Sequence, residues 1–426
     1  MKSTVWFLIG THIIDFTACK LIFYNIVMTK YAECCFFMGV IMKNNQTLHY
    51  LVILIYTCIY SFNINASVNY QHLFEGKSIL VTGGGGTLGS AVVKEILKYS
   101  PKSVTIFSRD ETKHFKFLES LHYPANLKSV LGDIRDFQAV LRATEGVDIV
   151  IHAAALKRVD SIESNVEESI KTNVLGSMNI YNACVLNKIK KAVFVSTDKS
   201  CSPISAYGAG KFLGEKIFTN YDRAACQTVF SCVRFGNIIG STGSIVPIFI
   251  EKIKNDEEIP LTDARMTRFM ITREDAVQFI FDAIQYSVGG EIFVKQLPSI
   301  KIIDLIETMI EKLHSKSKIK IIGLRPGERT FESLLSDNEL HHCYKYSDTY
   351  VIVPALKNWI DSFKNNDYPI YLKSGVALDT LFSKELNSDD FVISKEELEI
   401  IFDKLNILDE SNKQVKREEW YEDFYL

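Results

Sequence analysis

Residues 78–90 read SILVTGGGGTLGS, and this stretch decides the fold. The apolar run from Ser78 to Val81 is typical of a buried strand, and it leads directly into a glycine-rich turn. The residues from Ala91 to Leu97 then have the apolar spacing of an amphipathic helix. A strand, a tight turn and a helix in this order form the first unit of an α/β fold with a parallel sheet.

Three glycines of this turn, Gly83, Gly86 and Gly89, recur at every third residue. Such glycines allow a tight exit from the strand, close approach of backbone N–H groups to a pyrophosphate, and close packing of the helix on the sheet. The N-terminus of the following helix also attracts phosphate. We therefore predict a dinucleotide-binding turn, the alternative being a merely structural one, and its expected cofactor contacts are Gly83, Gly86, Thr87, Leu88 and Gly89.

A second strand is predicted at Val104 to Phe107, and it ends in Ser108, Arg109 and Asp110. These residues stand roughly 20 positions beyond the last glycine, where such folds bind the ribose 2′ position. An arginine there suits a 2′-phosphate, so NADP is the favoured cofactor. The neighbouring Asp110 leaves NAD open, and a surface arginine without a ligand is the third reading.

Two more strands are predicted at Val130 to Ile134 and at Val147 to Ile151. Small residues after the second of these leave room for a flat cofactor. The predicted contacts at the two strand ends are Asp133, Ile134, Ala153, Ala154 and Ala155. The succession of strands and helices predicts a Rossmann-type doubly wound parallel sheet.

The composition is that of a globular enzyme rather than of a disordered or nucleic-acid-binding chain. The 426 residues are 47% hydrophobic, and 48 basic side chains nearly balance 51 acidic ones. The sequence therefore predicts no nucleic-acid partner. The 9 cysteines form no C-x-x-C pair, so we expect reduced thiols and no metal site.

Residues 1–70 form a hydrophobic leader that differs from the rest of the chain. The apolar run from Leu48 to Phe62 is shorter than the roughly 20 residues of a transmembrane helix, and Asp15 and Lys20 interrupt an earlier run. Three readings stay open: a short membrane anchor, a signal-like segment, and upstream sequence outside the working protein. We expect a cytoplasmic catalytic domain, with weak membrane association through this leader under the first reading.

A polar constellation follows the strand predicted from Lys191 to Ser196. Thr197, Asp198 and Lys199 end this strand, and Tyr207 and Lys211 lie at positions i and i+4 of a predicted helix, on one face. A lysine ammonium near a phenol lowers the phenol pKa, so Tyr207 can exchange a proton with a substrate hydroxyl. The alternative for residues 197–199 is a polar strand end that caps the next turn.

The chain resembles the extended short-chain dehydrogenase/reductases and, within them, the UDP-N-acetylglucosamine 4,6-dehydratase group of bacterial polysaccharide biosynthesis. The resemblance covers roughly Phe74 to Pro354. The motifs that carry it are TGGGGTLGS from Thr82, FSRDE from Phe107, GDIRD from Gly132, HAAALKRV from His152, KTN from Lys171, STDKSCSPISAYGAGK from Ser196, VRFGNIIGSTGSIVP from Val233, MTRF from Met266 and GLRPGE from Gly323.

The resemblance implies that Tyr207 and Lys211 serve oxidation at sugar C4. It implies that Lys199 removes the C5 proton and that Asp198 protonates the departing 6-hydroxyl, while Thr197 contacts the sugar 4-hydroxyl or Tyr207. For Lys199, closeness to Lys211 and burial predict a lowered pKa. A UDP-sugar 4-epimerase and a non-catalytic dinucleotide sensor are the competing functions.

The resemblance also implies a substrate site for a UDP-sugar and self-association into a homo-oligomer. Arg234 matches a family position in the substrate-binding half of the chain, and a structural salt bridge is an equal alternative for it. Thr242 departs from the usual S-R-G-S pattern, which puts the fine sugar contacts in doubt. The expected substrate contacts are Lys157, Asn173, Asn237, Ser244, Arg268, Arg325 and Glu328.

Three regions are therefore predicted. The leader occupies residues 1–70, and an NADP-binding Rossmann domain occupies 71–235. Residues 236–426 form mainly a smaller substrate-binding domain with an acidic C-terminal tail, in which the residues from Ser394 to Leu405 have helical spacing.

Overall fold

The computed structural model describes residues 6–9, 12–15, 69–220, 227–241, 244–355, 359, 368–377 and 385–405. It divides the chain into one unit at Met1–Asn69 and a second at Tyr70–Leu426. In the first unit, β1 (Trp6–Ile9) pairs antiparallel with β2 (His12–Asp15). The apolar run at 48–62 lies outside the described residues. Among the helices that are described, none has the length and apolar character needed to span a membrane.

A ten-stranded sheet forms the centre of the second unit, counted over the described residues. Its parallel strands are, in spatial order, β5 (Leu127–Leu131), β4 (Ser103–Ser108), β3 (Ser78–Thr82), β6 (Ile149–His152), β7 (Lys191–Val195), β8 (Val229–Arg234) and β12 (Glu291–Lys295). Antiparallel strands continue beyond β12: β17 (Thr349–Ile352), β16 (Cys343–Tyr346) and β18 (Val376–Ala377). The predicted doubly wound parallel sheet is confirmed.

The direction of winding reverses between β3 and β6. The chain builds β3, β4 and β5 toward one edge and then returns to place β6 on the other side of β3. In such sheets the ligand crevice lies outside the carboxyl ends of the strands at this reversal. All residues of β3 are buried, as expected for a strand that helices cover on both faces.

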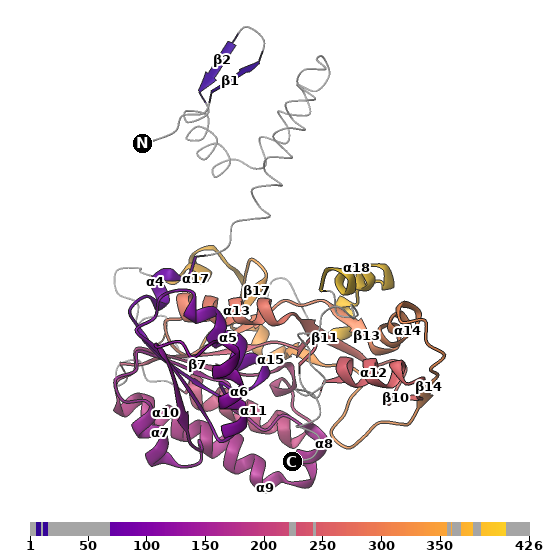
Figure 1. The fold of residues 1–426 in the computed structure, drawn as a ribbon, viewed down its shortest axis with the longest axis horizontal. Helices are drawn as coiled ribbons and strands as arrows, with labels where there is room; N and C mark the ends of the chain where they lie inside the picture. Colours follow the sequence, from indigo (N-terminus) through magenta and orange to yellow (C-terminus); the bar gives the residue numbers. More distant parts are fainter. Residues whose placement is uncertain are drawn as a thin grey trace. The chain divides into compact units, whose positions relative to one another are not determined.

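Helices cover both faces of the sheet (Figure 1). On one face α5 (Thr87–Leu97) packs on α13 (Arg273–Tyr286), and on the other α10 (Gly176–Leu186) packs against α7 (Phe137–Ala143) and α11 (Ala206–Thr219). The buried residues of α5 fall at helical spacing, which explains its docking. The other helical segments of this part are α4 (Gln71–Phe74), α6 (Glu111–Ser120), α8 (Val159–Ser164), α9 (Val166–Ser169), η1 (Ile170–Leu175), η2 (Asp198–Ser200), α15 (Asp337–Leu340) and α17 (Ile370–Ser374).

A second group of elements surrounds its own apolar cluster, on the right in Figure 1. Leu398 and Phe402 of the predicted tail helix belong to this cluster, so the tail helix is confirmed and packs as expected. The elements that contribute to this cluster are α12 (Ile245–Lys254), β10 (Ile259–Leu261), β11 (Thr267–Ile271), β13 (Ser299–Lys301), α14 (Ile302–Lys312), β14 (Ile319–Ile321) and α18 (Lys395–Leu405). Four short elements of the same half of the chain place apolar side chains in the cluster of the large sheet instead: β9 (Asn237–Ile238), β15 (Ser333–Leu335), β19 (Leu386–Asn387) and η5 (Ser388–Phe391).

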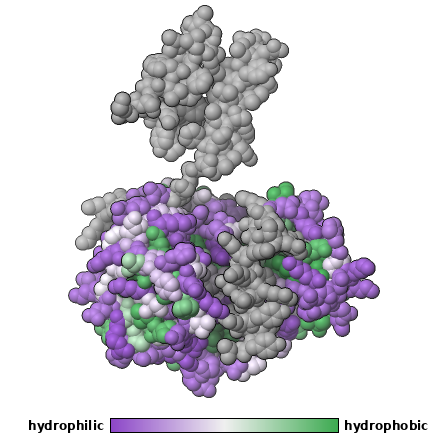
Figure 2. Space-filling model, viewed as in Figure 1, coloured by the Kyte–Doolittle hydropathy of each residue, from purple (hydrophilic) through white to green (hydrophobic). Residues whose placement is uncertain are grey.

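The large sheet also draws strands from the C-terminal half of the chain. β12, β16, β17 and β18 all lie beyond residue 235 yet extend the sheet past β8. They cover an edge that would otherwise expose unpaired backbone groups. The predicted division at residue 235 therefore does not coincide with the edge of the sheet. Hydrophilic side chains cover most of the visible described surface, and hydrophobic ones form separate patches (Figure 2).

Candidate active site

The glycine-rich turn after β3 touches the loop after β6. Gly83 has a φ of +68°, and a Cβ there would stand 2.9 Å from the Ala154 Cα. A Cβ on Gly89 would stand 2.3 Å from the Gly83 carbonyl oxygen. Both positions therefore require glycine. The backbone N–H of Gly86 donates to the Gly83 carbonyl, which closes the turn directly before α5.

Helix α5 begins at Thr87, one turn before the start at Ala91 that the apolar spacing predicted. The small and polar residues of this first turn have no apolar period, so the spacing alone missed it. Gly86 is its N-cap. Thr87 and Leu88 thus form the N-terminal turn of a helix that points at the crevice, the arrangement that binds phosphate. A glycine-rich turn before a helix N-terminus leaves its backbone N–H groups uncovered by side chains, which fits the pyrophosphate of a nicotinamide dinucleotide.

A buried histidine fixes the loop that carries Ala153, Ala154 and Ala155. The Thr82 hydroxyl and His152 Nδ1 lie 2.7 Å apart, and the Ala154 backbone N–H donates to the Thr82 hydroxyl at 3.2 Å. Burial first, and then the charge of Lys211, lower the pKa of His152 to about 3. The neutral imidazole is thus part of the scaffold, a role that sequence reasoning did not identify. The three alanines are partly exposed.

The residues after β4 and β5 have different roles in the structure. The Ser108 hydroxyl lies 2.6 Å from His114 Nε2, and the Asp110 carboxylate caps α6 by accepting from the Lys113 backbone N–H. Arg109, with 54% of its side chain exposed, lies 3.7 Å from the Asp133 carboxylate. Arg109 thus presents an exposed cation at the end of β4, whereas the Ser108 side chain contacts His114 and the Asp110 side chain caps α6.

Asp133 and Ile134 lie at the end of β5. Asp133 also pairs with Arg135 at 2.6 Å, and its pKa is lowered because these bonds to Arg135 outweigh the opposing effect of burial. Ile134 is buried, and its Cδ1 would lie 2.7 Å from a Cβ on Gly176. Ile134 therefore packs on the start of α10.

Asp198 is fully buried beneath the end of β7. Its Oδ1 accepts from the Thr197 hydroxyl at 2.8 Å and from Lys199 Nζ at 3.0 Å. Among the described residues, its Oδ2 has no hydrogen-bond partner. A buried carboxylate oxygen without a partner is costly, so Oδ2 is positioned to bind a hydroxyl of a ligand.

Tyr207 stands in the first turn of α11, whose N-cap Ser205 accepts from the Gly208 backbone N–H. The Tyr207 phenol lies close enough to Thr197, Asp198 and Lys199 for all three to act on its pKa, so it lies beside the Asp198 and Lys199 pair. Burial raises the pKa of Tyr207 to about 12, against a lowering effect of Lys199. The prediction that the pKa of the Tyr207 phenol is lowered is therefore wrong for the protein without its ligands, because burial of the phenol outweighs the effect of the nearby Lys199 ammonium.

Lys211 shares the buried face of α11 with Tyr207 but serves a different partner. Its Nζ donates to the Val195 carbonyl at 2.7 Å and lies 4.6 Å from the centre of the Phe194 ring. Burial lowers the pKa of Lys211 to about 8. In this structure the ammonium that acts on the Tyr207 phenol is that of Lys199.

Lys199 Nζ is surrounded by acceptors. It lies 3.0 Å from Asp198 Oδ1, 3.2 Å from Asn237 Oδ1 and 3.3 Å from Glu332 Oε1. Burial lowers the pKa of Lys199, but the Asp198 and Glu332 carboxylates outweigh it and the pKa is raised. The lowered pKa predicted for Lys199 is therefore wrong, because the sequence does not reveal Glu332 beside it.

Two of the predicted substrate residues lie in this cluster. Asn237 accepts from Lys199, and Arg268 is buried with its Nε 3.7 Å from Glu332 Oε1. The Arg268 guanidinium also donates to the carbonyls of Thr267 and Arg329.

The other predicted substrate residues have separate environments. The Asn173 amide holds both backbone groups of Leu156, at 2.8 and 2.9 Å, and so fixes the loop that continues into exposed Lys157. Arg325 and Glu328 share a loop in which the Arg325 backbone N–H donates to the Glu328 carboxylate. Ser244 caps α12, and within the described part of the chain its hydroxyl has no partner. Thr242 lies outside the described residues.

Arg234 belongs to the scaffold. It is fully buried between Glu215 of α11 and Glu339 of α15, at 2.7 and 2.8 Å. Of the two readings that the sequence left open for Arg234, the structural salt bridge is confirmed, because the side chain cannot reach a diphosphate from this position.

A model of the family described as "Polysaccharide biosynthesis protein" matches residues 79–354. The chain belongs to the polysaccharide biosynthesis protein family. A relative in Campylobacter jejuni subsp. jejuni serotype O:2, named UDP-N-acetylglucosamine 4,6-dehydratase (inverting), is 41% identical over 70% of this chain and 88% of its own length. A relative in Rickettsia bellii, named UDP-glucose 4-epimerase, is 39% identical over 63% of this chain and 80% of its own length.

Solved structures agree with this assignment. The X-ray structure of Pen from Bacillus thuringiensis matches with a TM-score of 0.72 and 34% identity, over 79% of this chain and 99% of that one. DesIV, a dTDP-glucose 4,6-dehydratase from Streptomyces venezuelae, matches with a TM-score of 0.55 and 23% identity, over 59% of this chain and 86% of that one. The second likeness concerns the fold alone. The resemblance read from the sequence motifs is thereby confirmed.

In this family member the crevice brings together a cofactor cradle, a buried phenol and a carboxylate–ammonium pair. The phenol can exchange a proton with a substrate hydroxyl, and the pair can take up one proton while giving another. Transfer of the proton between Lys199 Nζ and Asp198 Oδ1 turns an ammonium and a carboxylate into an amine and an acid without changing the net charge. The site therefore suits acid–base chemistry at two adjacent substrate positions.

Proposed function

We propose that this protein is a nucleotide-sugar 4,6-dehydratase that converts UDP-N-acetylglucosamine to a UDP-4-keto-6-deoxy sugar for surface polysaccharide or glycan biosynthesis. The observation that carries the proposal is the contact of Tyr207, Asp198 and Lys199 around Thr197. The name of the Campylobacter jejuni relative supports the same reaction and substrate.

The first step is oxidation at sugar C4. Tyr207 accepts the proton of the 4-hydroxyl as the phenolate. Burial disfavours this form and raises the pKa of Tyr207 to about 12, and the positive charge of Lys199 opposes that effect. A nicotinamide dinucleotide, when bound, supplies a reversible acceptor for the hydrogen on C4. Lys211 fixes the strand end by donating to the Val195 carbonyl, and its predicted part in the oxidation stays a prediction.

The second step is loss of water across C5 and C6. The C4 ketone acidifies the C5 proton, which Lys199 removes as the amine, and Asp198 gives its proton to the departing 6-hydroxyl. The hydride taken from C4 then returns to C6 and a proton returns to C5, which gives the 4-keto-6-deoxy sugar with no net oxidation. Because Lys199 Nζ contacts Asp198 Oδ1, one proton transfer between them produces both the Lys199 amine and the protonated Asp198. The proton given to the departing 6-hydroxyl is the one on Oδ1, which faces Lys199 Nζ, and we assign the unpartnered Oδ2 to accept a hydrogen bond from a sugar hydroxyl.

The decisive measurement is the mass of the product formed from UDP-N-acetylglucosamine without an external reductant. We expect the product to have lost one water, and mass spectrometry and NMR are used to detect this loss. Tyr207→Phe should suppress oxidation, on the order of 10²- to 10⁴-fold. Asp198→Asn and Lys199→Met should suppress dehydration more than exchange of hydrogen at C4, because both groups act after oxidation.

A UDP-sugar 4-epimerase is the second candidate, because the Rickettsia bellii relative carries that activity in its name. Epimerisation needs no acid at C6 and no base at C5, so it leaves the mass unchanged. An equal-mass epimer as the sole product, formed equally well by Asp198→Asn, would replace the dehydratase by this alternative.

We also propose NADP as the preferred cofactor. Support comes from Arg109, whose exposed guanidinium stands at the end of β4, where such folds bind the ribose 2′ position. We propose that the glycine turn, the first turn of α5 and the loop after β6 supply further contacts for the cofactor, from Gly83, Gly86, Thr87, Leu88, Gly89, Ala153, Ala154 and Ala155.

Arg109→Ala should weaken NADP binding and leave NAD binding nearly unchanged, because a charge-assisted contact to the 2′-phosphate is lost. Titration calorimetry of both cofactors against both proteins measures this difference. Equal affinity of the unmutated protein for NADP and NAD would contradict the proposal.

We also propose that the protein forms a homo-oligomer. Large apolar side chains are exposed on the adjacent helices α9 to α11, and a second copy would bury them. The exposed residues are Val166, Ile170, Leu175, Met178, Val185, Leu186 and Leu213. Light scattering of the full-length protein measures its mass in solution, and a monomer would contradict this proposal.

A further inference from the structure

Glu332 is a buried carboxylate in the site that neither the motifs nor the comparisons single out. Its side chain is 5% exposed, and its Oε1 lies 3.3 Å from Lys199 Nζ. It stands directly before β15, in a part of the chain far in sequence from the strand that carries Lys199. The fold therefore brings a third charged group to the pair of Asp198 and Lys199.

The backbone of Glu332 is held on both sides by one serine. Its N–H donates to the Ser388 hydroxyl at 3.0 Å, and its carbonyl accepts from the Ser388 N–H at 2.8 Å. Ser388 begins η5, next to the strand β19 that pairs with β15. These bonds fix the direction of the Glu332 side chain toward Lys199.

Two arginines, Arg268 and Arg329, also pair with Glu332. Arg268 Nε lies 3.7 Å from Oε1, and Arg329 Nε lies 3.3 Å from Oε2. Arg329 also donates to the carbonyls of Cys201 and Ser202, directly after η2. The loop that carries Glu332 is thus tied to the same short helix that carries Asp198 and Lys199.

We propose that Glu332 is a positioning residue for Lys199, which orients the Nζ between Asp198 and Asn237 and sets the pH range in which Lys199 serves as the base. This inference rests on the proposed dehydration. The ammonium donates hydrogen bonds to Asp198 Oδ1 and Asn237 Oδ1, and the Glu332 carboxylate forms an ion pair with it at 3.3 Å, so that three groups hold the Nζ in one place. Removal of the Glu332 charge leaves Asp198 as the carboxylate in contact with Lys199.

The charges that face Lys199 give the direction of the effect. Asp198 from η2 and Glu332 from the C-terminal loop favour the ammonium, whereas Arg268 from β11 disfavours it. Tyr207 from α11 is neutral well above pH 7, because its pKa is raised to about 12. Without Glu332, the Lys199 amine should therefore form at lower pH.

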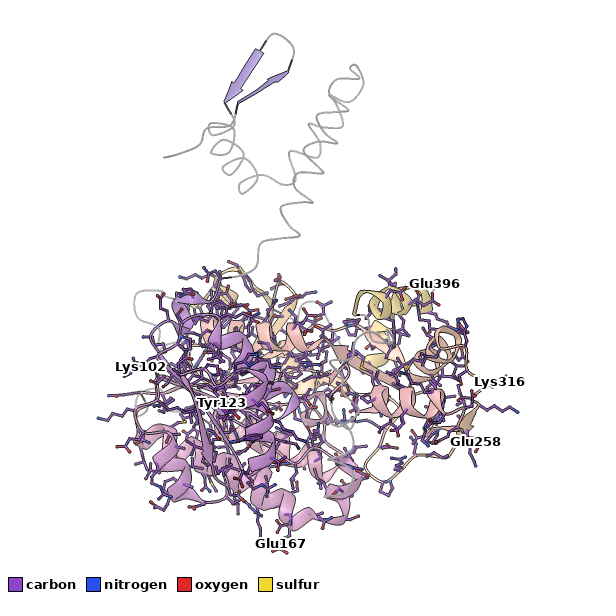
Figure 3. The ribbon with its side chains drawn as sticks, in the orientation of Figure 1. Lys102, Tyr123, Glu167, Glu258, Lys316 and Glu396 are labelled. Carbon is purple, nitrogen blue, oxygen red and sulfur yellow. The ribbon has the colours of Figure 1, made fainter. Side chains whose placement is uncertain are left out.

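The experiment measures the rate of water loss from UDP-N-acetylglucosamine against pH, with ordinary substrate and with substrate deuterated at C5. The isotope effect on kcat identifies the pH range in which removal of the C5 proton limits the rate. The full-length proteins compared are the wild type, Glu332→Gln, Glu332→Asp and the control Glu258→Gln. Glu258 is an exposed glutamate on the outer surface of the same half of the chain, labelled in Figure 3.

For Glu332→Gln we expect the rising part of the plot of kcat against pH to move toward acid by at least half a pH unit. We also expect kcat to change more than KM. Glu332→Asp keeps the charge but withdraws it by one methylene, so a smaller shift in the same direction is expected. Glu258→Gln should follow the wild type. A merely structural role would lower the rate equally at every pH.

A folded Glu332→Gln protein in which the rising part of this plot does not move would overturn the inference. If that variant does not fold, Glu332→Asp decides: a shift toward acid supports the inference, and a profile that superimposes on the wild type refutes it. If the wild-type protein releases no water, the proposed function itself fails, and this inference falls with it.

Discussion

At the residue scale, the charge state of each active-site group depends on which neighbour its side chain reaches. Tyr207 and Lys211 share one helix face, yet Lys211 reaches back to the Val195 carbonyl while Lys199 faces the phenol. Helical spacing predicted the shared face, because it follows from the geometry of 3.6 residues per turn. It could not predict the partners, which are set by the length and direction of each side chain.

His152 gives a prediction about stability against pH. Its folded pKa of about 3 lies below the ordinary value of 6.5, so burial of the neutral ring stabilises the fold above pH 6.5, and this contribution is lost as the pH falls toward 3. The slope is at most about 1.4 kcal/mol per pH unit. His152→Gln has no group to titrate there, so its free energy of unfolding should fall less steeply between pH 6.5 and 5.

Urea unfolding of the wild-type and His152→Gln proteins at pH 7.5, 6 and 5 measures the two slopes. The variant should be less stable than the wild type at pH 7.5, because the contacts to Thr82 and Ser177 are altered. Parallel curves for the two proteins would show that His152 is not the group responsible.

At the element scale, a buried ion triad connects three elements around the site. Arg234 at the end of β8 binds Glu215 of α11 and Glu339 of α15, and Glu215 also accepts from the Ser200 hydroxyl of η2. The helix that carries Tyr207 and the turn that carries Asp198 are thus held to one guanidinium. The triad is structural rather than catalytic, since no part of Arg234 reaches the crevice.

Arg234→Met should cost about 3–5 kcal/mol of unfolding free energy, because it leaves two buried carboxylates without their cation. A triple variant that also carries Glu215→Gln and Glu339→Gln should regain most of this loss. Arg265→Met is the matched control, since Arg265 is 78% exposed in its pair with Asp263, and it should leave the free energy of unfolding nearly unchanged. Urea unfolding measures all three, and an Arg234→Met protein as stable as the control would contradict this account.

Local elements were predictable from the sequence, whereas pairings between distant segments were not. The strand β3 and the glycine turn follow from neighbouring residues, so their prediction needed no knowledge of the rest of the chain. The addition of β16 and β17 to the sheet and the approach of Glu332 to Lys199 depend on contacts across long stretches of sequence. Neither has a periodic or compositional signal.

At the scale of the whole molecule, two apolar clusters flank the site. One runs through the large sheet, and the other lies among α12, α14 and α18. Lys199 follows a strand of the first. Arg268 lies on β11, which contributes Phe269 and Ile271 to the first cluster and Met270 to the second. The two arginines and Glu332 thus join groups from both clusters, so the site exists only when both are folded.

Residues 1–67 should be dispensable for folding and for catalysis, because every residue assigned to the site lies beyond Lys77. The second unit nevertheless begins with two buried aromatic residues, Tyr70 and Phe74, which are 2% and 0% exposed. Both rings pack on Phe281 of α13, with centroids 5.2 and 4.6 Å away, and the Tyr70 hydroxyl donates to Asp282 at 2.9 Å. The boundary of the working enzyme should therefore fall just before Tyr70.

A chain that starts at Val68 should match the full-length protein in the rate of water loss and in its urea midpoint. A chain that starts at Gly76 lacks both aromatic residues, and since loss of one buried aromatic side chain costs about 3–5 kcal/mol, it should be strongly destabilised. Circular dichroism during urea unfolding, together with the dehydration assay, compares the three proteins. If the chain that starts at Val68 did not fold, the leader would be part of the enzyme. If the chain that starts at Gly76 were as stable as the full-length protein, α13 would not need the two aromatic rings.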